Sequence, residues 1–261
     1  MEPRTILLDN ESGRRRTSAQ GPPPRKDLIM PFSARPDLVR SPVAIVTEGS
    51  RGIGRRAALR LAEDGFDVVV AYTDDRVAAE GTRAAIEEIA GRALAVETDV
   101  ADEAAVARLF QQAEEVFGTV DVVVHSAEIV MCGSVSELTP EEFAQMHRTN
   151  VLGAFVVGRH AARRVRSGGA LINLASDLSE SARSSYGAYV ACKAAVNALT
   201  VFLTGELRER NVTVNAVVLD PFVADPAHPE RPGELAGIAE AIAFLAGPGH
   251  WVNGQILHPG H

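Results

Sequence analysis

The sequence predicts an α/β fold, a doubly wound and mainly parallel seven-stranded sheet with helices on both faces. Short β-branched apolar runs alternate with longer amphipathic segments from residue 42 onward. The runs are continuously apolar, which is typical of strands buried on both faces of a parallel sheet. The segments between them have a helical period and would return the chain for the next parallel strand.

Each element follows from a local pattern. The expected strands are VAIVT (43–47), DVVVAY (67–72), ALAVE (93–97), VDVVVHS (120–126), ALINLA (170–175), VTVNAVV (212–218) and QILH (255–258). The expected helices are 53–64, 77–90, 103–117, 140–166, 186–209 and 234–246. In an open sheet of this kind, ligands bind at the carboxyl ends of the strands, so the residues just after each run are the functional candidates.

Composition sets the broad class. With 261 residues that are 46% hydrophobic, the chain can bury the core of one domain, which we place at residues 41–261. We find no apolar run long enough for a transmembrane helix and no secretory leader. The two cysteines, Cys132 and Cys192, lack metal-ligand spacing and are interpreted as reduced thiols. These features predict a cytoplasmic protein that does not bind a membrane.

The first 40 residues differ from the rest. They carry eight basic and five acidic residues and few periodic apolar positions, so we expect a disordered or loosely packed extension. A basic arm for nucleic acid is the alternative, and the acidic remainder of the chain argues against it. Met30 is a second candidate start of translation.

A glycine-rich turn follows the first expected strand. Residues 47–54 read TEGSRGIG, and Gly52 and Gly54 open the next helix, where free backbone N–H groups and the helix dipole favour a phosphate. A tight strand-to-helix connection would explain the glycines equally well. The second strand ends at Tyr72 and Thr73, with no acid there to grip a ribose 2′-hydroxyl. Together with Arg51 in the turn, this favours NADP(H) over NAD.

The strongest signal is YVACK at residues 189–193. Tyr189 and Lys193 lie four residues apart, so a helix puts them on one face. Lys193 is one of only two lysines among 26 basic residues. A lysine can assist a neighbouring phenol in acid–base chemistry, whereas arginine keeps its proton. Ser176 ends the preceding strand and would bind the substrate oxygen.

These motifs resemble the short-chain dehydrogenase/reductase family from about Val43 to His258. The resemblance includes the glycine turn, Asp99-Val100, the AEI stretch after the fourth strand, RTNVLGAF around Asn150, VTVNAV and AFLAGPGHWVNGQIL. It implies a Rossmann-type oxidoreductase that moves hydride between NADP(H) and a small carbonyl or alcohol. It also implies a homodimer or homotetramer, with residues 140–166 and 186–209 forming the subunit interface.

The resemblance assigns roles residue by residue. Tyr189 would protonate the carbonyl oxygen, Lys193 would bind the nicotinamide ribose and lower the tyrosine pKa, and Asn150 would help to hold a relay water. With Ser176 these residues complete the catalytic tetrad. The cofactor-binding set would be Thr47, Gly49, Ser50, Arg51, Gly52, Ile53, Gly54, Thr73, Asp99, Val100 and Lys193.

Three departures from the family pattern are all acidic. Glu48, Glu128 and Asp220 stand where the family has glycines beside the dinucleotide. Each adds a side chain where backbone should approach closely, and negative charge beside an anionic ligand. We therefore expect weakened NADP(H) binding. The span from Asp220 to Gly233 also looks too short and proline-rich for the family's substrate-covering helix.

Two interpretations remain open. The first is an NADP(H)-dependent reductase or dehydrogenase whose site is altered. The second is a related fold that has lost dinucleotide binding and acts as a cofactor-free acid–base catalyst or as a partner subunit. The seven histidines show no ligand pattern, so we expect no metal, and we expect no nucleic-acid partner.

Overall fold

The structure is a computed structural model that describes residues 40–176, 185–218 and 232–259. Our expectations for the N-terminal extension, for Asp220 and for most of the segment before Gly233 concern residues outside these ranges. That residues 41–261 form a single domain stays a prediction.

The predicted sheet is confirmed. Seven strands pair in the order β3-β2-β1-β4-β5-β6-β7, and every neighbouring pair is parallel. The strands are β1 (Val43–Thr47), β2 (Asp67–Tyr72), β3 (Ala93–Glu97), β4 (Val122–His125), β5 (Ala170–Ala175), β6 (Thr213–Val218) and β7 (Ile256–Leu257). The strand order reverses between β1 and β4, and this switch point is where such sheets bind ligands.

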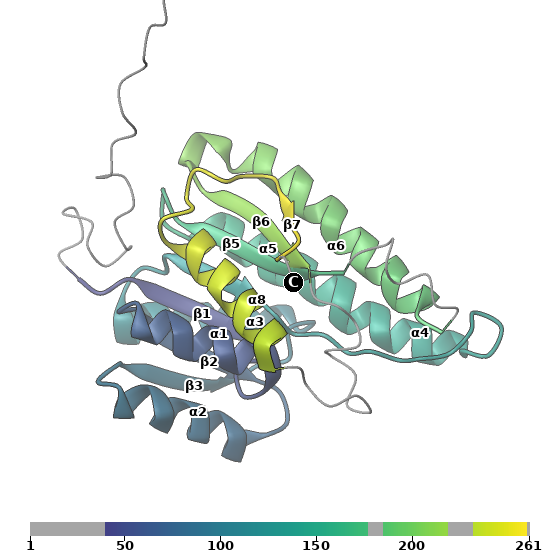
Figure 1. Cartoon of the computed structure of the whole chain (residues 1–261), viewed down its shortest axis with the longest axis horizontal. Helices are drawn as coiled ribbons and strands as arrows, with labels where there is room; N and C mark the ends of the chain where they lie inside the picture. Colours follow the sequence, from purple (N-terminus) through teal and green to yellow (C-terminus); the bar gives the residue numbers. More distant parts are fainter. Residues whose placement is uncertain (1–39, 177–184, 219–231, 260–261) are drawn as a thin grey trace, which may run out of the picture.

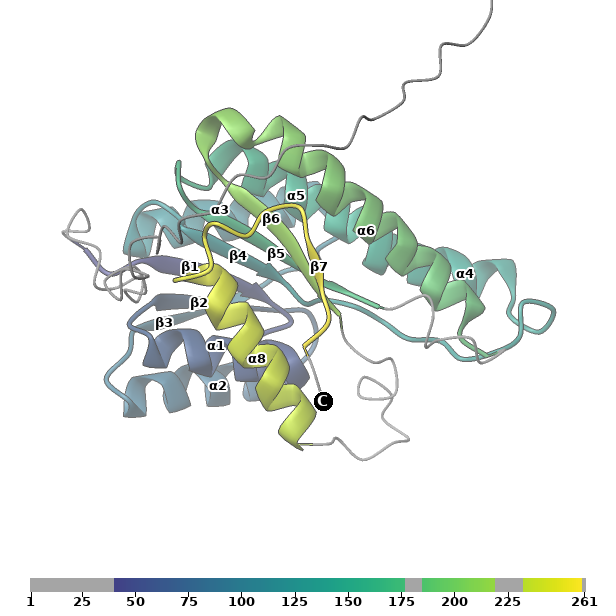
Figure 2. The ribbon, with the colours of Figure 1, turned by 45° about the horizontal axis from the view of Figure 1, so that its top comes forward.

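Helices cover both faces of the sheet (Figures 1 and 2). They are α1 (Gly52–Glu63), α2 (Arg76–Glu88), α3 (Glu103–Phe117), α4 (Pro140–His147), α5 (Gly153–Arg164), α6 (Gly187–Glu206) and α8 (Pro232–Ala246). The core residues of α1, α2 and α8 belong to one apolar cluster, and those of α3 and α5 belong to a second. The sheet therefore separates two apolar layers.

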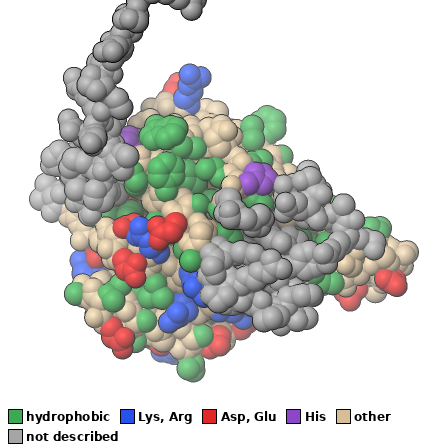
Figure 3. Space-filling model, viewed as in Figure 1, with side chains coloured by type: hydrophobic (Ala, Val, Ile, Leu, Met, Phe, Trp, Pro, Cys, Tyr) green, Lys and Arg blue, Asp and Glu red, His purple; other side chains and the backbone are tan. Residues whose placement is uncertain are grey.

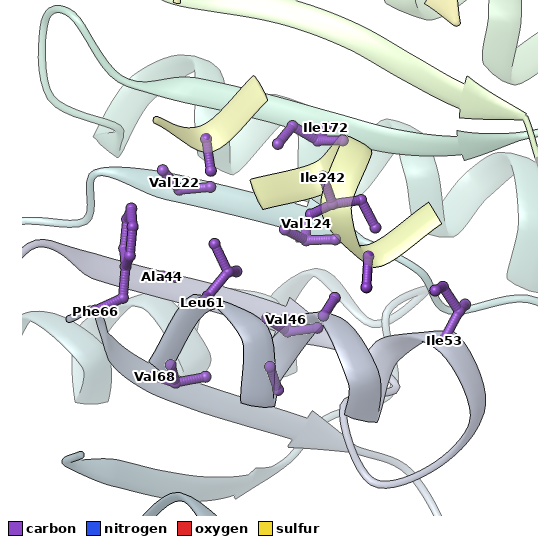
Figure 4. Close-up of a cluster of buried hydrophobic side chains, with 14 of the residues drawn as sticks. Ala44, Val46, Ile53, Leu61, Phe66, Val68, Val122, Val124, Ile172 and Ile242 are labelled. Carbon is purple, nitrogen blue, oxygen red and sulfur yellow. The ribbon is translucent and has the colours of Figure 1, made fainter. Parts of the chain in front are cut away.

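The first of these layers shows why the strand patterns are continuously apolar. In Figure 4, side chains from β1, β4 and β5 lie beside those of α1 and α8, with Leu61 and Ile242 as the helical contributions at its centre. Alternate residues of the same strands enter the other layer, as Ile45 and Val123 do. Both side-chain directions along a strand are therefore buried, which removes the need for polar alternation.

One predicted helix is interrupted. The sequence predicted a continuous helix over residues 140–166, but α4 ends at His147 and a π-helical turn, Arg148–Leu152, separates it from α5. A π-helical turn has more residues per turn than an α-helix, and the sequence prediction did not detect it. It places Asn150, which is 1% exposed, inside the fold. The other element ends differ from the prediction by at most two or three residues.

The helix α6 is long and apolar enough to cross a membrane by length and composition. This is weak evidence, because a core helix passes the same test. In the fold α6 packs against β5 and β6 and contributes buried Val196 and Thr200.

The surface carries paired charges. On the face drawn in Figure 3, acidic and basic side chains lie next to one another. Arg60 on α1 contacts Asp64, the residue just after this helix, at 2.5 Å and Glu240 on α8 at 2.8 Å. Exposed pairs of this kind contribute little to stability, so they orient α8 on α1 more than they hold it there.

Candidate active site

The turn after β1 is built around close backbone approach. Gly52 has φ +51° and begins α1, and the N-cap residue Arg51 makes no side-chain cap. A Cβ at Gly54 would lie 2.3 Å from the Glu48 carbonyl oxygen, so only glycine fits. The first turn of α1 also contains no acidic residue. The N–H groups at this end of α1 therefore lack a side-chain cap, and phosphate binding there stays a prediction.

The end of β1 is tied to the segment after β4. The Thr47 hydroxyl oxygen accepts hydrogen bonds from the backbone N–H of Ser126 at 2.9 Å and of Ala127 at 3.0 Å. His125 Nδ1 lies 3.1 Å from the same hydroxyl. Burial, together with the nearby Lys193 charge, lowers the pKa of His125 to about 3. His125 is therefore a neutral structural residue at physiological pH.

Glu48 is paired with Arg51 in the structure. It adopts φ +51°, and its carboxylate accepts hydrogen bonds from Arg51 Nε at 2.8 Å and from the backbone N–H of Glu128 at 3.0 Å. Burial raises the pKa of Glu48, and these two hydrogen bonds oppose that rise. The side chain thus lies across the base of the turn and uses part of the Arg51 guanidinium.

Glu128 also has a cationic partner, and that partner is Lys193. One carboxylate oxygen, Oε2, pairs with Lys193 Nζ and accepts a hydrogen bond from the Tyr189 hydroxyl at 3.1 Å. Lys193 also donates to the Leu174 carbonyl of β5 at 2.9 Å. Tyr189 is fully buried and Lys193 is 3% exposed. The sequence predicted the shared face of Tyr189 and Lys193, but it did not predict that Glu128 joins them.

The other two tetrad candidates lie at the same end of the sheet. Ser176 directly follows β5 and is fully buried. Asn150 accepts a hydrogen bond from the backbone N–H of Ile129 and donates one to its carbonyl, both at 2.8 Å. Asn150 therefore fixes the backbone next to Glu128.

The remaining cofactor candidates surround the switch point. Gly49 lies against β2, where a Cβ would be 3.1 Å from a Val70 methyl group. The Ser50 carbonyl accepts a hydrogen bond from the Thr82 hydroxyl at 3.3 Å, and Ile53 is buried in the first apolar layer. Thr73, just after β2, donates to the carbonyl of Thr98 at 3.2 Å.

Two further cofactor candidates, Asp99 and Val100, follow β3. Asp99 pairs with Arg148 of the π-helical turn at 2.7 Å, and this hydrogen bond is the main reason why the pKa of Asp99 is lowered. No pattern in the sequence indicates Arg148 as a partner of Asp99. Val100 is buried in the second apolar layer.

Two further candidates can be placed. Cys192 is buried beside Met146 and Tyr186, and burial raises the pKa of its thiol, as expected for a packing residue. Within the described ranges, the structure contains no cluster of three or more histidine, cysteine or carboxylate side chains that could hold a metal ion.

Comparisons with known proteins agree with this architecture. The family model described as short chain dehydrogenase matches residues 42–234. A short-chain type dehydrogenase/reductase of Picea abies is 37% identical, with 82% of this chain and 89% of the relative covered. NADPH-dependent aldehyde reductase 2, chloroplastic, of Arabidopsis thaliana is 35% identical over 86% of this chain and 94% of its own.

A solved structure shows the same fold. The short chain dehydrogenase from Burkholderia cenocepacia J2315 in complex with NADP matches with a TM-score of 0.76 and 31% identity, covering 84% of this chain and 96% of the other. The matched family model covers well over half of the sequence, including the glycine turn and the Tyr189–Lys193 motif. The chain therefore belongs to the short-chain dehydrogenase family of oxidoreductases.

Proposed function

We propose that this protein is an NADP(H)-dependent oxidoreductase that reduces a small carbonyl compound or oxidises the corresponding alcohol. The observation that carries the proposal is that the Tyr189 hydroxyl and Lys193 Nζ contact the same carboxylate oxygen, Glu128 Oε2, just after β4. The Arabidopsis relative is named as NADPH-dependent, and the Burkholderia structure as a complex with NADP.

The residues of the site would divide the work. The N-terminus of α1, from Gly52 to Gly54, would hold the phosphates, and Arg51 would meet a 2′-phosphate. Lys193 would hold the ribose near the reacting carbon. Bound NADP(H) would supply the hydride. Ser176 would orient the carbonyl oxygen, and Tyr189 would hold the proton that this oxygen receives. Asn150 would position the segment around Ile129.

The N-terminus of α1, where the phosphates would lie, fits the dinucleotide better than the surroundings of Lys193 do. The uncapped turn is ready for an anion, whereas Lys193 is already engaged by Glu128. We propose that Glu48, Glu128 and Asp220 together weaken NADP(H) binding, and that changing all three to glycine strengthens it. The effects of neighbouring substitutions on the binding free energy rarely add, so the gain should differ from the sum of the three single changes.

The engagement of Lys193 also favours the second interpretation. The Glu128 carboxylate occupies the groups that hydride transfer would need. A protein that no longer transfers hydride would tolerate such a contact. In that case the protein would be a cofactor-free acid–base catalyst or a partner subunit. Titration of the purified protein with NADPH and NADH, followed by cofactor fluorescence, separates the two interpretations, since only the first predicts saturable NADPH binding.

The catalytic assignment is tested by Tyr189→Phe. NADPH oxidation with a panel of aldehydes should fall on the order of a hundredfold or more, because phenylalanine has no proton to donate. Tyr186→Phe removes a hydroxyl from the N-cap of the same helix and should keep activity. Turnover that survives in Tyr189→Phe would exclude Tyr189 as the acid.

Assembly and location complete the proposal. We propose a homodimer or homotetramer that uses the outer faces of α5 and α6, with no nucleic-acid or membrane partner. A cytoplasmic location is also proposed, although the Arabidopsis relative is named as chloroplastic. Cell fractionation checks the location.

A further inference from the structure

Glu128 makes a three-way contact at the centre of the candidate site. The single oxygen Oε2 both pairs with Lys193 Nζ and accepts a hydrogen bond from the Tyr189 hydroxyl. The Glu128 side chain is only 9% exposed, and the Lys193 side chain is 4% exposed. Water therefore screens this pair weakly, and a charge left alone in this place would be costly.

The backbone on both sides of Glu128 is fixed. Thr47 binds the N–H groups of the two preceding residues, Glu48 binds the N–H of Glu128 itself, and Asn150 binds both polar groups of Ile129. These contacts come from β1, the glycine turn and the π-helical turn. The carboxylate is thus aimed at Lys193 by three separate parts of the fold.

The contact uses the groups that the proposed reaction needs. A hydroxyl has one proton to donate, and in this structure Tyr189 directs its proton to Glu128. Lys193 has three N–H donors, and Glu128 and the Leu174 carbonyl take two of them. A ribose hydroxyl or a substrate oxygen would have to replace the carboxylate.

We propose that Glu128 is an internal ligand of Tyr189 and Lys193 that holds them in a resting state and competes directly with the ribose of NADP(H). This inference rests on the proposed function, because it names the group that the cofactor must displace. It differs from general repulsion between acids and phosphates. Repulsion of the cofactor phosphates needs only the charge of Glu128. Competition with the ribose also needs Lys193, because both ligands would bind to it.

A double-substitution cycle without cofactor tests the resting state first. Glu128→Gln should lower the melting temperature by several degrees, because it leaves the Lys193 charge buried without a counter-charge. Adding Lys193→Met should recover part of the loss, since both charges are then gone. If the two changes simply add, Glu128 does not hold Lys193 and the proposal is wrong. Should Lys193→Met fail to fold, Lys193→Gln takes its place in the cycle.

NADPH titration of the same variants tests the competition. Glu128→Gln should tighten NADPH binding on the order of tenfold or more in the parent protein, and should change it little when Lys193 is Met. Equal tightening in both backgrounds would show repulsion only, and unchanged affinity would show neither effect. Either result overturns the proposal.

Two controls complete the experiment. Glu141→Gln removes one charge from the exposed start of α4 and should leave both melting temperature and affinity unchanged. Glu48→Gln removes a neighbouring charge but keeps a side-chain oxygen that can accept the hydrogen bond from the Glu128 N–H. Glu128 then stays in place, so the effect of this change should not depend on Lys193. If no variant binds NADPH, the proposed cofactor and the competition both fail, while the cofactor-free cycle still reports whether Glu128 holds Lys193.

Discussion

Among the individual residues, His125 contributes a pH dependence that can be isolated. Its imidazole is 4% exposed, and its pKa is lowered to about 3 by burial and by Lys193. In the unfolded chain the same group titrates near its ordinary value of about 6.5. The folded state therefore binds fewer protons than the unfolded state between these values, and stability is lost as the pH falls below about 6.5.

His125→Asn should remove that dependence. Between pH 7 and pH 5 the free energy of unfolding of the parent protein should fall by about 2 kcal/mol more than that of the variant. Urea unfolding at the two pH values measures the difference. Equal slopes for the two proteins would mean that His125 takes up its proton in the folded state.

Glu48 and Glu128 show what the sequence could reveal at this scale. Their positions at the turn and after β4 identified them as unusual acids beside a candidate site. Their partners, Arg51 and Lys193, were not predicted. The Glu128–Lys193 pair joins residues 65 positions apart, and no local pattern encodes which way a side chain turns in such a contact.

Among the elements, the turn between β1 and α1 depends on Gly54. A Cβ there would meet the Glu48 carbonyl oxygen at 2.3 Å and the Ser126 hydroxyl at 2.6 Å. Because one of these contacts is with backbone, the turn itself would have to move. Gly54→Ala should therefore lower the free energy of unfolding by about 1–3 kcal/mol and weaken NADPH binding.

Gly81→Ala is the matched control. Gly81 lies inside α2, and a Cβ there would meet nothing within 4 Å. Alanine should stabilise this exposed helical position by up to about 1 kcal/mol. Thermal unfolding of both variants makes the comparison, and a Gly54→Ala protein as stable as the parent would show that the turn tolerates a side chain.

The elements were more predictable than their interruptions. The apolar pattern identified every strand and the ends of most helices. Strands buried on both faces are continuously apolar, and helices buried on one face have apolar residues at a helical period. The π-helical turn at Arg148–Leu152 was missed. It contains Asn150, whose side chain binds the backbone of Ile129. That contact joins residues 21 positions apart, which no local pattern encodes.

At the scale of the whole molecule, the outer face of α6 is apolar, and α5 beside it exposes a phenylalanine. The helices pack against each other, and Gly158 of α5 lies close to Leu203 of α6. Phe202 is 74% exposed and Phe155 is 51% exposed. Large apolar side chains gathered on neighbouring helices are typical of a surface that another protein chain covers. The family resemblance implies that this chain is a second copy.

Phe202→Glu should therefore break the proposed assembly. A carboxylate at the centre of an apolar contact would lose its hydration on association, and symmetry would place the change on both copies. Light scattering after size exclusion should show the mass of a single chain for Phe202→Glu and a multiple of that mass for the parent protein. Val77→Glu, at an 84% exposed position on α2, adds the same charge on a helix beside β2 and β3 and should leave the assembly intact. If the parent protein and Phe202→Glu show equal masses, α6 does not form the interface, and equal loss of assembly in Val77→Glu would mean that net charge alone controls association.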